Sequence, residues 1–274
     1  MPSSSPTPAS HLLIKAGLFI AVVAAGLYIG TRRAPGPQAA AASPEEPLVV
    51  YCAASLRVPV EALAKDYQAR YQVQTSIQFG GSQTLLSNID VTKKGDLFLP
   101  ADDSYFAMAK AKGLLASTLP IAAQSAVVMT AKGNPKKIKD LSDLLRSDVR
   151  LAISNPDAAA IGKLLRDKLG SDYWQALSKK AVLTAATVTE AANAVKADGA
   201  DAAFIWNSMA RQYPDNTLVE LPEITGVTAQ VGVGLLTCSK QDAAAMKFAQ
   251  FLSAKETGVP VFKREGFEAV TSGQ

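Results

Sequence analysis

Histidine is almost absent from this chain of 274 residues. The single histidine, His11, precedes an apolar N-terminal run and so lies outside the part of the chain that has globular composition. A Ser-His-Asp or Cys-His nucleophile system therefore cannot form in the globular part, and zinc sites that use imidazole are excluded for the same reason. A Gly-x-Ser-x-Gly elbow and a phosphate-loop lysine motif are also missing. These absences argue against an enzyme that acts on an anionic ester.

Cysteine and clustered charge are scarce as well. The two cysteines, Cys52 and Cys238, each stand at the end of an apolar run, which predicts two buried thiols; a disulfide in an oxidising compartment is the alternative. Charged residues make up 19% of the chain and the net charge is +4. The basic residues are scattered without interleaved aromatics, so we predict no nucleic-acid surface.

The first 47 residues combine an apolar run with a linker. Residues Ala16 to Gly30 are apolar or glycine, and the run extends upstream across Lys15 towards the roughly 20 residues that a membrane-spanning helix needs. We predict an uncleaved N-terminal transmembrane helix, with a cleaved signal peptide as the alternative. A Pro/Ala-rich linker follows. The globular part should then begin near Leu48 and lie in the periplasm, tethered to the inner membrane.

From Leu48 onward, strand and helix patterns alternate, which predicts an α/β fold with mainly parallel sheets. One sheet holding all these strands would be large, so two βαβ lobes with a ligand cleft between them are expected. The predicted strands are Leu48–Tyr51, Val73–Phe79, Gly95–Asp102, Ser125–Gly133, Val149–Pro156, Ala181–Val188, Ala200–Trp206 and Ala229–Thr237, with two helical patterns following between Asp242 and Phe267.

Four junctions share one design: a strand, then small residues, then a helix N-terminus. They lie at Ser55, at Ser82, at Ala158–Ile161 and at Val188–Thr189. Helix N-termini present unpaired N–H groups and the positive end of the helix dipole, so they bind anions without a cationic side chain. The alternative for the two serines is that they only cap the helices that follow them.

Two further features leave alternatives open. Trp206 ends the strand "AAFIW" and is by default a core or lobe-interface aromatic, although its indole N–H can also donate to a ligand. Asp96, Asp102 and Asp103 cluster in the sequence and can suggest a metal site. Helix capping and turn roles are the preferred interpretation for these three carboxylates, because Asp96 and Asp102 flank one short strand.

The chain resembles the periplasmic substrate-binding proteins of molybdate ABC transporters, which have the two-lobed type II periplasmic-binding fold. The resemblance runs from about residue 48 to 268. It rests on "VVYCAASL", "FGGSQTL", "GDLFLPAD", "SNPDAAAIGKLLRDKLG", "ADAAFIWNSMA" and "FLSAKETGVPVFKREGF", which occur in the order of the family.

The resemblance implies a tetrahedral dianion, molybdate or tungstate, buried between the lobes and held by neutral donors. The donors would be the hydroxyls of Ser55 and Ser82 and the amides near Ile161 and Val188. Trp206 stands where the family usually has a tyrosine, which leaves a different oxyanion as an alternative.

The resemblance also implies the organisation and the partner. Lobe 1 would comprise residues 48–123 and 233–274, lobe 2 residues 124–232, and the hinges Ala122–Ala126 and Gln230–Gly234. No cofactor is implied, and the expected partner is an ABC transporter permease. A tethered sensor of oxyanions is the rival function that the sequence cannot separate from transport.

Overall fold

The computed structural model describes residues 46–270. Most of the predicted anchor and linker lies outside the described residues. Within residues 46–270, no helix is long and apolar enough to cross a membrane. The strands are β1 Leu48–Ala53, β2 Thr75–Gly80, β3 Leu97–Leu99, β4 Leu115–Thr130, β5 Leu151–Ser154, β6 Leu183–Ala185, β7 Ala202–Trp206, β8 Thr217–Val219 and β9 Thr228–Leu236.

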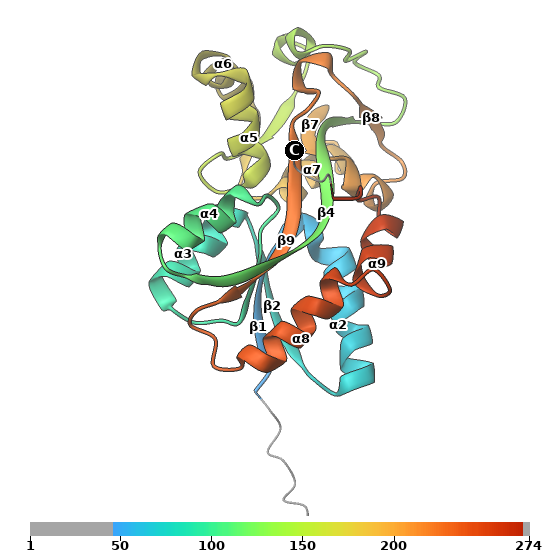
Figure 1. Ribbon diagram of the computed structural model, residues 1–274. Helices are drawn as coiled ribbons and strands as arrows, with labels where there is room; N and C mark the ends of the chain where they lie inside the picture. Colours follow the sequence, from blue (N-terminus) through green and yellow to red (C-terminus); the bar gives the residue numbers. More distant parts are fainter. Residues whose placement is uncertain (1–45, 271–274) are drawn as a thin grey trace, which may run out of the picture. The chain divides into compact units, whose positions relative to one another are not determined.

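The helices alternate with the strands, as the sequence predicts. They cover the sheet, with α3 packed on α4 and with α2, α8 and α9 packed together on the other side of the lower strands (Figure 1). The helices are α2 Arg57–Tyr71, α3 Ser82–Thr92, α4 Ser104–Ala111, α5 Ala160–Leu169, α6 Ser171–Lys180, α7 Val188–Lys196, α8 Asp242–Ser253 and α9 Gly258–Arg264, and the 3₁₀ turns are η1 Ala54–Leu56, η2 Leu141–Leu145, η3 Asn207–Gln212 and η4 Pro222–Ile224.

The expectation of mainly parallel sheets is wrong. In the first strand group, β1 pairs in parallel with β2 and β3, and in the second, β5 pairs in parallel with β6 and β7. Between the groups, β9 and β4 pair antiparallel with each other and with their other neighbours. The result is one mixed path in the order β2-β1-β3-β9-β4-β7-β5-β6, with β8 beside β4. The α/β class is confirmed, with a mixed sheet.

The long strand β4 joins the two groups, and the sequence shows only its second half. The predicted strand began at Ser125, but β4 begins at Leu115. The missed part contains Pro120, where the β4–β9 register shifts. A proline and a register shift are typical of a strand bend and conceal the alternating pattern.

The two predicted hinge segments lie side by side. Ala122 pairs with Val231 and Ala123 with Gln230 in the antiparallel β4–β9 ladder. Ala123 also forms an isolated bridge with Glu268, near the C-terminus. The predicted lobe boundaries, 123/124 and 232/233, therefore fall inside these paired strands, and their role as hinges stays a prediction.

Three local sequence patterns had different outcomes. The pattern "DLSDLLRS" predicts a helix with Asp140 as its N-cap; Asp140 accepts a hydrogen bond from the Asp143 amide, so the cap is confirmed, although η2 is a 3₁₀ turn. The pattern "DSYFAMAKAKGLL" predicts a helix capped at Asp103 or Ser104. The N-cap position of α4 is Asp103, as predicted, but its side chain makes no capping hydrogen bond, and Asp102 accepts from the Ser104 amide at 3.1 Å. The helical pattern "AAIGKLLRDKL" ends at Leu169, so the sequence does not predict helix α6.

Both cysteines are free, so the disulfide alternative is wrong. Cys52 is buried in β1, as predicted, and burial raises the pKa of its thiol far above the usual range. Cys238 is only half-buried, which corrects the expectation for this residue.

Asp96 holds the start of β3 to its neighbours. Its side chain is buried, and its carboxylate accepts hydrogen bonds from the Val49 amide at 2.8 Å and from the Ser239 hydroxyl at 2.7 Å. A carboxylate that joins a strand to the loop after β9 is part of the scaffold.

We expect Asp96→Ala to lower the free energy of unfolding by about 3 kcal/mol, because the Val49 amide loses a charged acceptor. Chemical denaturation measures this loss. The matched control is Asp66→Ala, which removes an exposed ion pair with Arg70 in α2 and should cost less than about 1 kcal/mol. Equal losses in the two variants would contradict the structural role of Asp96.

Candidate functional site

The carboxyl ends of several strands meet around one small cavity. Strand β1 leads into η1, β2 into α3, β5 into α5 and β6 into α7, while β7 ends at Trp206. The cavity has a volume of about 10 Å³, close to the space that one water molecule needs. It is lined by Ala53, Ala54, Ser55, Gly80, Gly81, Ser82, Ala101, Ala159, Ala160, Ile161, Thr187, Val188 and Trp206.

The structure brings the five predicted ligand-binding residues to this cavity. Ser55, Ser82, Ile161, Val188 and Trp206 all line it, although they are spread over some 150 positions of the chain. Other lining residues, such as Ala101 and Thr187, were not predicted. The only signal for them in the sequence is that they are small residues that shortly precede a helix.

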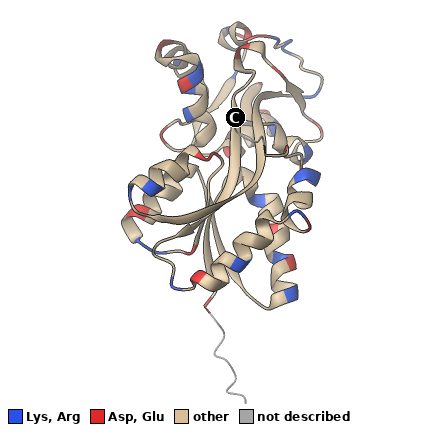
Figure 2. Ribbon diagram, viewed as in Figure 1, with Lys and Arg blue, Asp and Glu red and all other residues tan. Residues whose placement is uncertain are grey.

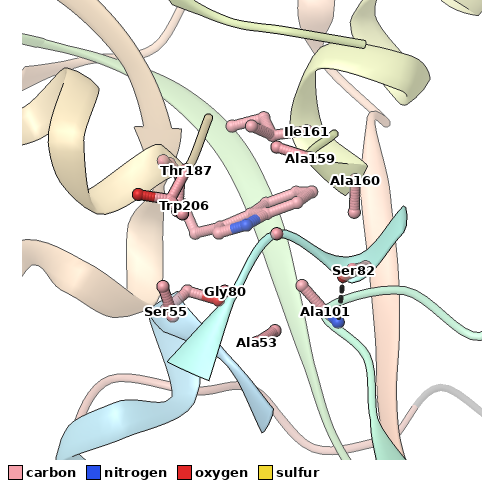
Figure 3. A pocket seen from close by; sticks show the side chains of 13 residues that line it. Ala53, Ser55, Gly80, Ser82, Ala101, Ala159, Ala160, Ile161, Thr187 and Trp206 are labelled. Carbon is pink, nitrogen blue, oxygen red and sulfur yellow. Dashed lines mark hydrogen bonds between the residues drawn. The ribbon is translucent and has the colours of Figure 1, made fainter. Parts of the chain in front are cut away.

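The two serines present different hydroxyl groups. Ser55 is buried, and its Oγ has no hydrogen-bond partner among the described residues. Ser82 is equally buried, but its Oγ accepts a hydrogen bond from the Ala101 amide at 3.0 Å, as Figure 3 shows. The Ser82 hydroxyl proton can still be donated, because accepting uses only an oxygen lone pair.

Neither serine acts as a helix cap. The N-cap of α2 is Leu56 and that of α3 is Gly81, and no side chain caps η1, α2 or α3. The interpretation of Ser55 and Ser82 as simple caps is therefore wrong. A buried hydroxyl that lacks a partner lowers the free energy of unfolding. Stability therefore does not explain why a serine stands at position 55.

Backbone amides are the other candidate donors. Ile161 and Val188 lie in the first turns of α5 and α7, where the N–H groups have no carbonyl partner within the helix. Helix α5 has no side-chain cap, and in α7 the Thr187 side chain caps only the Glu190 amide. With α3, three helix N-termini converge here, and each carries a partial positive charge that favours an anion.

The lining of the cavity is neutral throughout, since none of its residues has an ionisable side chain. No described strand contains a charged residue either, and in Figure 2 the strands are tan while Lys, Arg, Asp and Glu lie on helices and loops. Arg57, which follows Ser55 closely, is held by the Phe79 ring at 3.8 Å and by Glu61 at 2.9 Å. Any charge placed in this cavity must be balanced by dipoles and hydrogen bonds.

The carboxylate of Asp102 directly follows the lining residue Ala101 in the chain. It is buried, and burial raises its pKa, while the hydrogen bonds from Ser104 lower it. These bonds come from the Ser104 amide and hydroxyl and stabilise the start of α4. The Asp102 carboxylate is thus engaged by Ser104 at the start of α4, next to the N-cap residue Asp103.

Trp206 is buried within the cavity wall. It is 1% exposed and pairs with Ala126 across the β4–β7 ladder. In the view of Figure 3, the indole lies between Thr187 and Ile161 on one side and Ser55 and Ser82 on the other, with its nitrogen on the edge nearer the serines. No hydrogen bond is drawn from this nitrogen to another lining residue. The lining offers neutral donors and no ionisable side chain that could act as an acid or a base.

Residues 48–268 match the sequence profile of a family described as bacterial extracellular solute-binding proteins. A Haemophilus influenzae protein described as a binding protein is 29% identical over 222 residues, covering 80% of this chain and 90% of its own length. The molybdate-binding protein ModA of Mycobacterium bovis is 27% identical over 265 residues, covering 93% of this chain and 97% of its own length.

Solved structures show the same fold. The periplasmic molybdate-binding protein of Azotobacter vinelandii superposes with a TM-score of 0.69 at 19% identity, covering 82% of this chain and all (100%) of that one. Other structures with this fold are named for binding sulfate, thiamin or iron. The shared fold is therefore compatible with several ligands.

Proposed function

Because this chain belongs to the bacterial extracellular solute-binding proteins, we propose that it captures a small tetrahedral oxyanion, molybdate first, and delivers it to an ABC transporter. The observation that carries this proposal is the neutral donor set: the unpartnered Ser55 hydroxyl, the Ser82 hydroxyl, the Trp206 indole and the first amides of α5 and α7 around one cavity. An anion enclosed in this way is stable only if its oxygens find donors.

The donor set and the size of the cavity favour an inorganic oxyanion over the other ligands of this fold. Iron requires carboxylate, imidazole or similar ligands, and the lining has none. Organic ligands such as thiamin occupy pockets of roughly 300 Å³ or more. This cavity has about 10 Å³ and would need to open much less for one tetrahedral ion than for such a ligand. The ModA relatives support molybdate within this class. Tungstate has the same shape and charge and should bind as well.

We expect molybdate and tungstate to raise the melting temperature of the protein, while phosphate has no effect. At a hundredfold excess over Kd, binding should add about 2.7 kcal/mol, a shift of roughly 5–10 °C for a domain of this size. Phosphate keeps a proton near neutral pH, and the lining has no carboxylate to accept a hydrogen bond from its O–H. Differential scanning fluorimetry with molybdate, tungstate, sulfate and phosphate measures the shifts. No shift with any of them would refute the proposal.

An uptake experiment in cells distinguishes a transport function from a sensing function. If the protein feeds a transporter, deleting it should abolish uptake of radiolabelled molybdate at low external concentration, and re-expression of the full chain should restore uptake. A tethered sensor would leave uptake capacity intact and change only gene expression. Membrane tethering by residues 16–30 stays a prediction, which fractionation of the full chain tests.

A further inference from the structure

The first turn of α3, which follows β2 of the first strand group, contacts a loop of the second strand group. The Gln83 amide donates a hydrogen bond to the carbonyl of Ala158, in the loop before α5, at 3.0 Å. Ala158 is 75 positions further along the chain. The two halves that would open as lobes are therefore joined by a backbone hydrogen bond at the edge of the cavity.

Gly81 makes this approach possible. A Cβ atom on Gly81 would lie 2.4 Å from the Ala158 carbonyl oxygen and 2.7 Å from that of Ala186, in the loop before α7. Both oxygens belong to loops that follow strands of the second group, β5 and β6. The backbone of Gly81 itself has φ −73° and ψ 144°, which any residue adopts. Glycine is thus required by the contact between the halves and not by local conformation.

We propose that Gly81 is the positioning residue for closure: its missing side chain lets the α3 N-terminus dock against the loops before α5 and α7, and the Gln83–Ala158 hydrogen bond holds the closed form. The inference deepens the proposed function and rests on it for its effect on ligand binding. Closure brings the donors on α5 and α7 within reach of an anion that already contacts Ser55 and Ser82.

Gly81→Ala separates closure from folding. The alanine fits the local backbone, so the variant should fold, and the melting temperature of the empty protein should fall only by what the contact between the halves contributes. The carbonyls must retreat by about 1 Å before the contact distance is normal, which takes the α5 and α7 donors away from the ligand. Each lost hydrogen bond to a charged acceptor weakens binding by roughly 10-fold or more, so we expect molybdate affinity to drop at least tenfold.

Spin labels measure closure without a ligand. Ser87 on α3 and Lys168 on α5 are exposed and belong to different halves. In the full chain carrying Cys238→Ser, with Cys52 buried, cysteines at these two positions accept labels for distance measurement. Gly81→Ala should move the distances to longer values. The matched control is Gly80→Ala, whose Cβ would meet only the Leu85 side chain, at 3.3 Å, within the same half; its distances should stay those of the parent protein.

A second variant tests the hydrogen bond. Proline is tolerated in the first turn of a helix, so Gln83→Pro removes the donor to Ala158 and should lengthen the distances, whereas Gln83→Ala keeps the N–H and should not. Unchanged distances in both Gly81→Ala and Gln83→Pro would overturn the inference. If the parent protein binds no oxyanion, the proposed function fails, but the label distances still decide the role of Gly81.

Discussion

Ser55→Ala is expected to weaken molybdate binding by about 10- to 100-fold while leaving the empty protein at least as stable as before. The Ser55 hydroxyl is buried without a partner in the described part of the chain. A hydrogen bond from such a group to a charged oxygen contributes about 1.5–3 kcal/mol. In the empty protein the same hydroxyl is a cost, so its removal should not lower the free energy of unfolding.

Isothermal titration calorimetry gives the change in affinity, and chemical denaturation without ligand gives the stability. Ser82→Ala is the informative comparison, because the Ser82 Oγ accepts from the Ala101 amide. Its removal leaves that amide unpaired and should cost about 1–3 kcal/mol of stability as well as affinity. The contrary result, a Ser55→Ala protein that is destabilised and binds normally, would make Ser55 a structural residue.

Trp206→Phe is expected to weaken molybdate binding by about tenfold or more, because it removes the indole N–H and keeps an aromatic ring. Trp206→Tyr restores a donor and should recover part of the affinity. Both substitutions shrink a side chain that is 1% exposed, so both should lower the free energy of unfolding by about 1–3 kcal/mol. Comparing the two variants separates the effect of losing the N–H donor from the effect of the smaller side-chain volume.

The fluorescence of Trp206 provides a second test. The chain has two tryptophans, and Trp174 lies in α6, away from the cavity lining. In a Trp174→Phe background, adding molybdate should change the emission of Trp206, since a dianion would lie beside its indole. Normal affinity in Trp206→Phe, together with unchanged emission, would assign Trp206 to the core alone.

The sequence by itself determined the chemical character of the site. With its only histidine at position 11, and with uncharged strands that end in small residues, the chain has neutral hydroxyls, an indole and helix amides at its strand ends. These features are local, since apolar alternation and small junction residues follow from neighbouring positions. For that reason the α/β class was predictable, and the five residues that line the cavity could be singled out, while their role in binding stays a prediction.

Only the tertiary structure decided how these pieces meet. The continuation of β4 through both strand groups depends on pairing with β9, more than 100 positions away in the chain, which local periodicity does not encode. The difference between Ser55 and Ser82 depends on the Ala101 amide, which only the fold brings to Ser82. Likewise, the sequence shows Gly81 only as one of the small residues before Ser82 that would let an anion approach the backbone. The carbonyls of Ala158 and Ala186 that exclude a side chain there come from elements far along the chain, because close packing is a property of the assembled fold.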